Sequence, residues 1–167
     1  MIEANGPAMK WTESIVVARP REQVHAAIAD EHRLMEWSAW PKATGFSCAV
    51  DGDGTSIGSA IVFRDRAGTE QGRQLLTRVA TDRVEYRLRN RGPFGREMTP
   101  EVDFRLEALD DTRTRVHLDF RAAAPLPPGA RHLAEAILGR RVRRLHVEDL
   151  EGLKAHVETS RPREPEK

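Results

Sequence analysis

The stretch "EMTPEVDFRLEAL", residues 97–109, decides the fold class because its apolar and charged side chains alternate. One face of an extended chain would carry the apolar residues Val102, Phe104, Leu106 and Ala108. The other face would carry the charged residues Glu101, Asp103, Arg105 and Glu107. This period of two is typical of a strand in an antiparallel sheet with one buried face and one solvent face. The rest of the chain must therefore supply a layer that covers the apolar face.

The segment that follows repeats the alternation and determines how the two strands pair. Its apolar face would carry Val116, Leu118, Phe120 and Ala122. A two-residue turn would place Leu106 opposite Arg115 and so join unlike faces. A three-residue turn through Thr112 places Glu107 opposite Arg115 instead. We therefore predict the longer turn in an antiparallel hairpin.

Turn-forming residues divide residues 43–124 into six predicted strands, and one more strand precedes them. The dividing turns are "DGDG", "DRAG", "ATDR", "NRGPFG" and "LDDT". The earlier strand is "KWTESIVVA", residues 10–18, which has branched residues and partial alternation. The sequence therefore predicts an antiparallel sheet of seven strands.

Two short helices are expected after the first strand, and one long helix at the end of the chain. The segment "RPREQVHAAIADEH", residues 19–32, opens on Pro20, which suits a first helical turn. The segment "HRLMEWSAWPK", residues 32–42, predicts a second short helix that is ended by Pro41. The long helix is expected over residues 131–158, with apolar residues near helical spacing at Leu138, Val142, Leu145, Leu153 and Val157.

Length and charge favour one domain without a broad electrostatic binding surface. A chain of 167 residues suffices for one ordinary domain, which we place at residues 9–159, with flexible termini at 1–8 and 160–167. The 27 basic and 26 acidic residues leave a net charge of +1, so a nucleic acid partner is not expected. Monomer and homodimer both stay open.

Cysteine content and hydropathy predict a cytoplasmic protein. Cys48 is the only cysteine, which excludes an internal disulfide and a zinc site with several cysteines. The first residues, "MIEANGPAMKW", lack the basic and apolar regions of a signal peptide. No apolar run approaches the roughly 20 residues that span a bilayer, so membrane insertion is not expected.

Three segments carry a resemblance to a known superfamily: "ESIVVARPREQVHAAIADEHRLMEWSAWPK" at 13–42, "SIGSAIVFRD" at 56–65 and "DLEGLKAHVE" at 149–158. They resemble the START/Bet v 1-like (SRPBCC) superfamily, in particular its polyketide cyclase/dehydrase and lipid-transport branch. The resemblance implies an α+β helix-grip fold, in which a curved seven-stranded antiparallel sheet wraps around a long C-terminal helix. Two short helices follow the first strand in that fold, and a cavity between sheet and helix takes an apolar or amphipathic ligand.

The residues expected to face the ligand are Trp37, Trp40, Phe63, Arg73, Leu75, Tyr86, Phe104, Phe120, Leu138 and Val142. Trp37 and Trp40 fall where the short helices would close the broad end of the grip. Their rings either line the ligand cavity or plug the open end of the sheet as core residues. The sequence leaves both interpretations open.

Arg73 and Tyr86 are the polar candidates on the predicted inner face. If Leu75 points inward, Arg73 points toward the cavity or its rim, where a guanidinium could orient a carboxylate or enolate oxygen. The alternative is that the strand bulges or ends there and leaves Arg73 in solvent. Tyr86 lies between Val84 and Leu88 on the inward face, so its hydroxyl needs a ligand or a protein partner.

Neither a metal site nor a nucleotide site is predicted. The six histidines are dispersed, without the spacing of metal ligands. The segment "DGDGTSIG", residues 51–58, misses the dinucleotide spacing and fails the calcium pattern at Ser56 and Val62. We interpret it as a hairpin turn. No cofactor is expected, and no catalytic residue can be assigned.

Two functions are consistent with the sequence. The first is binding of a small apolar or amphipathic ligand (polyketide-, aromatic- or lipid-like) in an internal cavity, with cyclase/dehydrase-like activity left open. The second is docking on protein or RNA through the arginines of "GRRVRRLH", residues 139–146. Against docking, Glu148 is spaced to pair with Arg144, which favours a solvated outer helix face.

Overall fold

The computed structural model describes residues 9–91, 95–123 and 131–160. Its strands are β1 (Met9–Val17), β2 (Ser47–Asp51), β3 (Ala60–Arg64), β4 (Glu70–Ala80), β5 (Arg83–Arg91), β6 (Glu97–Met98), β7 (Glu101–Asp110) and β8 (Arg113–Ala122). Its helices are α1 (Arg21–Ala29), α2 (Glu31–Trp37), α3 (Trp40–Thr44) and α4 (Arg131–Thr159). The termini predicted to be flexible lie outside the described residues, apart from Ser160.

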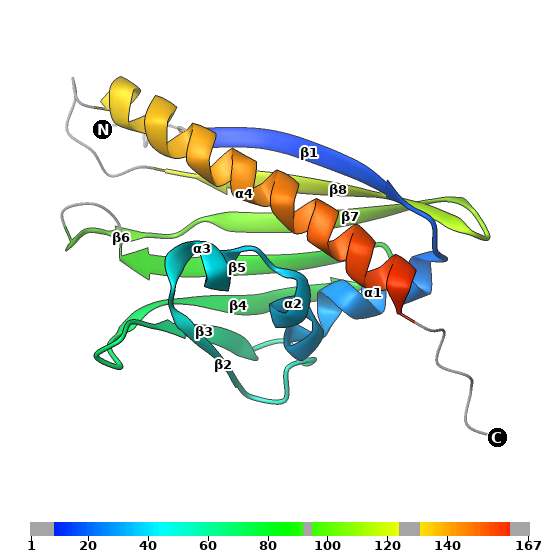
Figure 1. Cartoon of the computed structure of the whole chain (residues 1–167), viewed down its shortest axis with the longest axis horizontal. Helices are drawn as coiled ribbons and strands as arrows, with labels where there is room; N and C mark the ends of the chain where they lie inside the picture. Colours follow the sequence, from blue (N-terminus) through cyan, green and yellow to red (C-terminus); the bar gives the residue numbers. More distant parts are fainter. Residues whose placement is uncertain (1–8, 92–94, 124–130, 161–167) are drawn as a thin grey trace, which may run out of the picture.

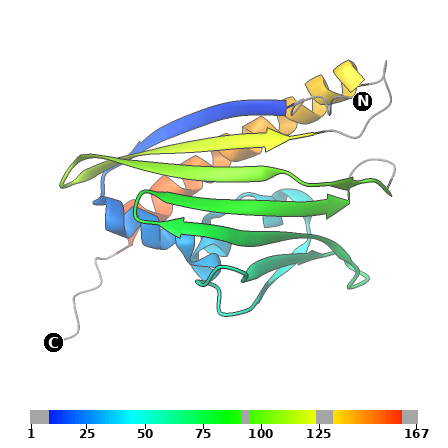
Figure 2. The same ribbon diagram turned by 180° about the vertical axis from the view of Figure 1, so that it is seen from behind.

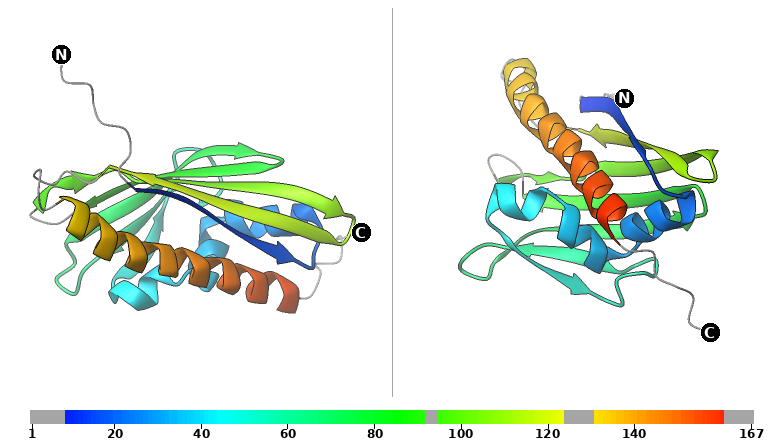
Figure 3. Two further views of the ribbon diagram at one scale, coloured as in Figure 1. Left: turned by 90° about the horizontal axis from the view of Figure 1, so that it is seen from above. Right: turned by 45° about the vertical axis from the view of Figure 1, so that its right-hand side comes forward.

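The strands of the described residues form one antiparallel sheet in the order β1-β8-β7-β5-β4-β3-β2, with the short β6 paired to β5. Figure 1 shows α4 crossing this sheet, and the reverse view in Figure 2 shows α1 to α4 on one side of it. Seen from above, the sheet curves over α4 (Figure 3). The predicted α+β helix-grip fold is confirmed, but the single strand predicted over residues 97–109 is divided at Thr99 and Pro100 into the short β6 and β7.

The apolar faces of β7 and β8 form the core against the helices, as their alternation predicts. Phe104 and Leu106 on β7 are buried, and so are Leu118 and Phe120 on β8. The last half of α4 completes this core with the buried side chains of Leu150, Leu153 and Val157. Among the described helices, including α4, none combines the length and apolar character needed to cross a membrane.

The register of the β7–β8 hairpin agrees with the prediction, but its turn does not. Glu107 pairs with Arg115, as expected. The connection, however, contains only residues 111 and 112, because Asp110 already pairs with Arg113. The extra residue is Leu109, which interrupts the ladder as a β-bulge. A bulge therefore restores the matching of faces that we had attributed to a longer turn.

The segment after α1 contains two helices, so the prediction that Pro41 ends a helix is wrong. Asp30 caps α2 by accepting hydrogen bonds from the backbone N–H groups of His32 and Arg33, at 3.0 and 3.4 Å. Extended backbone at Ser38 ends α2. Pro41 lies in the first turn of α3, where its missing N–H costs no helical hydrogen bond.

A β-bulge in β4 reverses the predicted inner face of that strand. Val79 pairs with Val84 on β5, as expected for residues that share a face. Between Leu76 and Arg78 the register shifts by one residue, so Leu76 rather than Leu75 pairs with Tyr86. One extra residue moves the preceding side chains of β4 to the opposite face, as far as a second irregularity at Gln71, which lies between the paired Glu70 and Gly72. Leu75 therefore lies on the convex face, against the prediction, and Arg73 lies there as well, because the strand bulges as the alternative interpretation of Arg73 stated.

The loop between β2 and β3 connects an antiparallel hairpin, which confirms the interpretation of "DGDGTSIG". The loop is tied to α2 by Glu31, whose side chain is fully buried. The Glu31 backbone N–H donates to the Gly54 carbonyl at 2.8 Å, and the Ser59 hydroxyl donates to Glu31 Oε2 at 2.6 Å. Burial raises the pKa of Glu31 in spite of this hydrogen bond. The contact holds the β2–β3 edge of the sheet against the helices.

Candidate functional site

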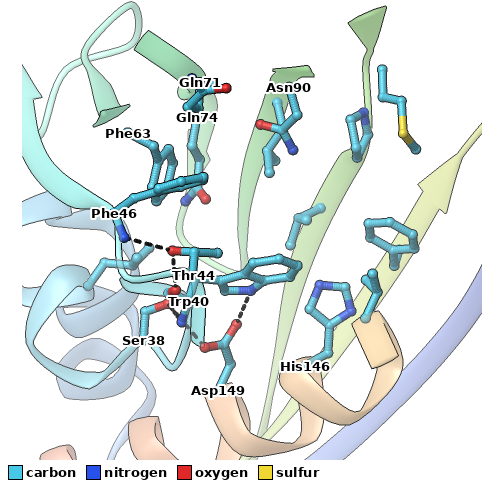
Figure 4. Close-up of a pocket in the computed structure, with 18 of the residues that line it drawn as sticks. Ser38, Trp40, Thr44, Phe46, Phe63, Gln71, Gln74, Asn90, His146 and Asp149 are labelled. Atoms are coloured by element: carbon cyan, nitrogen blue, oxygen red, sulfur yellow. Dashed lines mark hydrogen bonds between the residues drawn. The ribbon is translucent and has the colours of Figure 1, made fainter. Parts of the chain in front are cut away.

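A partly enclosed cavity of about 270 Å³ lies between the concave face of the sheet and the α2, α3 and α4 helices. Its floor comes from β3, β4, β5, β7 and β8, and α4 forms one wall. Figure 4 shows its residues converging from these elements. Most of the lining side chains are aromatic or aliphatic, and a few polar groups stand among them. The cavity is therefore an apolar chamber with separate polar positions.

The cavity brings together the predicted residues Trp37, Trp40, Phe63, Phe104, Phe120, Leu138 and Val142. They are far apart in the sequence and meet because three strands and three helices present their inner faces at one place. The remaining predicted residues, Arg73, Leu75 and Tyr86, do not line it.

Arg73 and Tyr86 have protein partners outside the cavity. Arg73 Nη1 contacts Asp51 Oδ2 at 3.1 Å and Arg73 Nε contacts Glu70 Oε1 at 2.9 Å, which form a small ion-pair group on the convex face. Tyr86 does point inward, but it is only 1% exposed. Its hydroxyl donates to the backbone carbonyl of Ile28 at 2.7 Å, so it fastens α1 to the sheet. The structural partner, one of the two alternatives for Tyr86, is the one observed.

Trp37 and Trp40 line the cavity and are also anchored in the fold. The Trp37 indole N–H donates to the carbonyl of Ala27 at 2.9 Å, and its ring packs edge-on against Phe104. The Trp40 indole N–H donates to Asp149 Oδ2 at 3.0 Å. The two interpretations of the tryptophans therefore do not exclude each other, because the same rings pack and face the space.

Asp149 is a buried carboxyl group at the cavity wall that sequence reasoning missed. Its Oδ1 accepts hydrogen bonds from the Ala39 backbone N–H at 2.7 Å and from the Ser38 hydroxyl at 3.1 Å. Together with the Trp40 indole, these donors tie α4 to the α2–α3 junction. Burial raises the pKa of Asp149 to about 7, against the lowering effect of the hydrogen bonds.

His146 is the second polar residue of α4 that sequence reasoning missed. Its Nδ1 accepts a hydrogen bond from the indole N–H of Trp11 on β1 at 3.1 Å. Its ring packs against Phe120, with 4.8 Å between ring centroids, and lies 5.9 Å from the Trp40 ring. Burial lowers the pKa of His146 to about 4, so the imidazole is neutral at physiological pH.

A signal for these two residues was present in the sequence. Val142, Leu145 and Leu153 were assigned to the inner face of the long helix. Asp149 lies four residues after Leu145 and four before Leu153, on the same face of an α-helix. His146 lies four residues after Val142. Ionisable residues inside an apolar helical stripe are candidates for buried polar groups, and the spacing alone identifies both.

Amide side chains form a polar part of the sheet wall. Gln74 on β4 and Asn90 on β5 line the cavity, across from Trp40 and His146 in Figure 4. Gly72 makes room for Asn90, because a Cβ atom at position 72 would lie 2.3 Å from Asn90 Oδ1. Gln71 also lines the space and donates to Asp65 at 2.6 Å. The wall opposite α4 thus offers neutral donors and acceptors, and Arg91 at the end of β5 adds a positive charge to the lining.

Two further features bear on the other functions considered. Within the part of the chain that the structure describes, no group of three or more His, Cys, Asp or Glu side chains is arranged to hold a metal ion. In the arginine-rich segment, Arg143 forms an ion pair with Glu13, and Arg144 Nε contacts Glu148 Oε1 at 3.2 Å. Arg140 and Arg141 are exposed. Two of the arginines thus serve contacts within the chain, and no observation on the described residues favours docking.

Comparison with known proteins adds a family and a set of similar folds. The family model for polyketide cyclase / dehydrase and lipid transport matches residues 8–158 of the sequence. No curated protein sequence matches significantly.

Several solved structures share the fold at low sequence identity. The Zhui aromatase/cyclase from Streptomyces sp. R1128 gives a TM-score of 0.64 at 18% identity, covering 89% of this chain and 93% of that one. A protein from Chromobacterium violaceum gives 0.60 at 19% identity, covering 91% and 99%. A protein from Arthrobacter aurescens gives 0.63 at 16% identity, covering 92% and 88%. At such identities the likeness concerns the fold alone.

Proposed function

Because the chain belongs to the polyketide cyclase/dehydrase and lipid transport family, we propose that it binds a small apolar or amphipathic ligand in the cavity between its sheet and α4. The observation that carries this proposal is the cavity of about 270 Å³ with mainly aromatic and aliphatic walls. Polyketide-, aromatic- and lipid-like molecules are the classes that such walls suit.

Binding would be driven by the removal of apolar surface from water, both on the ligand and on the cavity walls. A bound aromatic or aliphatic ligand gains roughly 25 cal/mol for each Å² of apolar surface that it buries. Phe63, Phe104, Phe120 and the two cavity tryptophans offer flat surfaces for ring contacts. Polar positions on α4 and on the amide wall can then orient a ligand that carries oxygen atoms.

Binding can be tested with two valine substitutions on the same helix. Val142 lines the cavity, whereas Val147 lies on the outer side of α4 with 37% of its surface exposed. The uncharged fluorescent probe N-phenyl-1-naphthylamine should bind saturably to the wild-type protein. Val142→Phe should fill part of the space and weaken binding roughly tenfold or more, while Val147→Phe should leave the affinity unchanged. Absence of saturable binding to the wild-type protein, or equal affinity in both variants, would contradict the proposal.

Cyclase- or dehydrase-like proton transfer in the same cavity is a second candidate, and Asp149 is the observation that favours it. A carboxyl group with a pKa of about 7 can accept and return a proton near neutral pH. Its proximity to a diketone in the cavity would promote loss of a proton from the carbon between two carbonyls, which leaves an enolate. Asp149 would hold this proton and return it to the same carbon. In D₂O the carboxyl group would exchange the proton with solvent and return a deuteron instead.

The proton transfer can be measured as deuterium exchange at the central carbon of 1-phenylbutane-1,3-dione by NMR. The wild-type protein should accelerate the exchange above the buffer rate, and Asp149→Asn should lose the acceleration. Exchange at the buffer rate with wild-type protein, or equal acceleration by Asp149→Asn, would remove this candidate. Either result would leave ligand binding itself intact.

A further inference from the structure

The contact between Trp11 and His146 determines which imidazole nitrogen carries the proton. An indole N–H can only donate a hydrogen bond, so His146 Nδ1, at 3.1 Å, must accept with its lone pair. In a neutral imidazole the proton is then on Nε2. Trp11 and His146 lie 135 positions apart in the sequence and meet because β1 runs beside α4.

The surroundings of His146 keep the ring neutral. Aromatic rings of Phe120, Trp11 and Trp40 surround it, and burial lowers its pKa to about 4. Asp149 is the nearest acid along the inner face of α4, but its carboxyl group bonds to Ser38, the Ala39 backbone and Trp40 instead. Within the described part of the chain, no carboxylate is thus bonded to His146 to stabilise a charged imidazolium.

The Nε2–H group of His146 is positioned to donate a hydrogen bond to a ligand in the cavity. His146 is one of the cavity-lining residues, and Figure 4 shows its ring reaching from α4 toward the space beside Trp40. The hydrogen bonds found among the described residues include no acceptor for His146 Nε2. Because His146 lines the cavity, an Nε2–H without an acceptor among the described residues can donate to an acceptor that a ligand supplies.

We propose that His146 acts as a fixed hydrogen-bond donor that selects cavity ligands carrying an uncharged acceptor, such as a ketone or quinone carbonyl, on an apolar aromatic body. This proposal deepens the ligand-binding function and rests on it. A charged carboxylate is disfavoured beside His146, because it would lose water among the rings of Trp11, Trp40 and Phe120, whereas the charged lining residue Arg91 lies on β5. The amides of Gln74 and Asn90 on the opposite wall can receive a second polar group of the same ligand.

Two probes of nearly equal shape distinguish the contribution of the His146 hydrogen bond from that of the apolar cavity walls. The probe 9-fluorenone carries one carbonyl oxygen, and fluorene carries none. The ratio of their dissociation constants, compared between wild type and His146→Phe, cancels the different hydration of the two probes. The substitution should reduce the relative preference for fluorenone roughly fivefold to tenfold. Leu138→Ala, which alters the cavity wall without touching a donor, should weaken both probes alike and keep the ratio.

Two measurements on the wild-type protein keep the test decisive if His146→Phe does not fold. Nitrogen-15 NMR of labelled histidine should show the His146 proton on Nε2 at neutral pH. The infrared carbonyl stretch of bound fluorenone should move to lower frequency than in an alkane solvent, as hydrogen bonding requires.

A proton on Nδ1, an unshifted stretch, or an unchanged preference in a folded His146→Phe variant would overturn the role of His146. If the wild-type protein binds both probes but does not prefer fluorenone, the role of His146 is overturned and the ligand-binding function is not. If neither probe binds the wild-type protein, the ligand-binding function itself is overturned, and the role of His146 with it.

Discussion

Asp149 makes the stability of the protein depend on pH in a predictable direction. In the unfolded chain an aspartate ionises near pH 4, whereas burial raises the pKa of Asp149 in the folded protein to about 7. Between these values the folded state binds more protons than the unfolded state. The stability contributed by the protonated group is full below about pH 4 and is lost as the pH rises through about 7.

This dependence is measurable by urea unfolding of wild type and Asp149→Asn from about pH 4 to about pH 8. The free energy of unfolding of the wild-type protein should fall relative to that of Asp149→Asn, by at most about 1.4 kcal/mol per pH unit. Glu148→Gln is the matched control, because Glu148 is the exposed neighbour that pairs with Arg144. Equal pH profiles for wild type and Asp149→Asn would show that Asp149 keeps an ordinary pKa in the folded protein.

For Arg73 we predict no effect on ligand binding, because the bulge in β4 places this residue on the convex face, away from the cavity. Arg73→Met should leave the affinities for anionic and uncharged cavity probes unchanged. Its ion pairs with Asp51 and Glu70 are partly exposed, so the free energy of unfolding should change by less than about 1 kcal/mol. Calorimetric titration with 1-naphthoate and 1-naphthamide tests this directly. A loss of affinity restricted to the naphthoate would return Arg73 to the binding site.

Among the elements, α4 depends on a close approach to the α2–α3 junction at Gly152. A Cβ atom at this position would lie 2.3 Å from the backbone carbonyl oxygen of Trp37. That oxygen cannot rotate away as a side chain can, so α4 or the junction would have to move. The same contact region holds the hydrogen bonds of Asp149 to Ser38 and Ala39. The absence of a side chain at Gly152 is therefore part of what brings Asp149 to its donors.

We expect Gly152→Ala to destabilise the protein by about 1–3 kcal/mol, despite the better helix propensity of alanine. Gly139 in the same helix is the control, because a Cβ atom at that position would meet Met9 and Trp11 only at an ordinary 3.8 Å. Gly139→Ala should be neutral or stabilise by up to about 1 kcal/mol. Thermal or urea unfolding of the two variants provides the comparison. A stable Gly152→Ala protein would mean that the junction yields at little cost.

On the scale of the whole molecule, the space between the sheet and α4 is filled by core side chains at one end and contains the cavity at the other. The end formed by α1 and the last turns of α4 contains the fully buried Val24, Ile28 and Leu153. The end near α3 and β6 contains the cavity. There the first half of α4 leaves Leu133 and Ile137 exposed by 70% and 65%. The part of α4 beside the cavity thus has less packing to hold it than the part over the core.

This unequal packing predicts unequal hydrogen exchange along α4. Amides of residues 135–142 should exchange faster than those of residues 149–157 in the free protein, because local opening is easier where fewer apolar contacts are lost. N-phenyl-1-naphthylamine should slow exchange mainly in the first segment, since Leu138 and Val142 line the cavity. Hydrogen exchange followed by mass spectrometry, with and without the probe, measures the exchange rates of the two segments and the effect of the probe on each. Protection spread evenly over α4 would show that the helix opens as one unit.

Much of the architecture could be predicted because its signals are local. Alternation along residues 101–122 specifies which faces of β7 and β8 are buried, and the spacing of apolar residues specifies α4. Most of the predicted cavity residues, from Trp37 to Val142, also line the cavity. Phe104 and Phe120 follow from the alternation along their strands, and Leu138 and Val142 from the helical spacing of apolar residues in α4. The positions of Asp149 and His146 on the inner face of α4 could have been predicted in the same way.

Only the tertiary structure decided the rest, because it depends on pairings between distant segments. The face of Arg73 depends on one bulge in β4, and a single extra residue reverses a period of two. The burial of Asp149 depends on donors at Ser38 and Ala39, which lie 111 and 110 positions earlier in the sequence. The tautomer of His146 depends on Trp11 at the other end of the chain. The sequence by itself determined the sheet, the helix and the apolar lining, whereas folding alone set the protonation and direction of the polar groups, since these are properties of contacts.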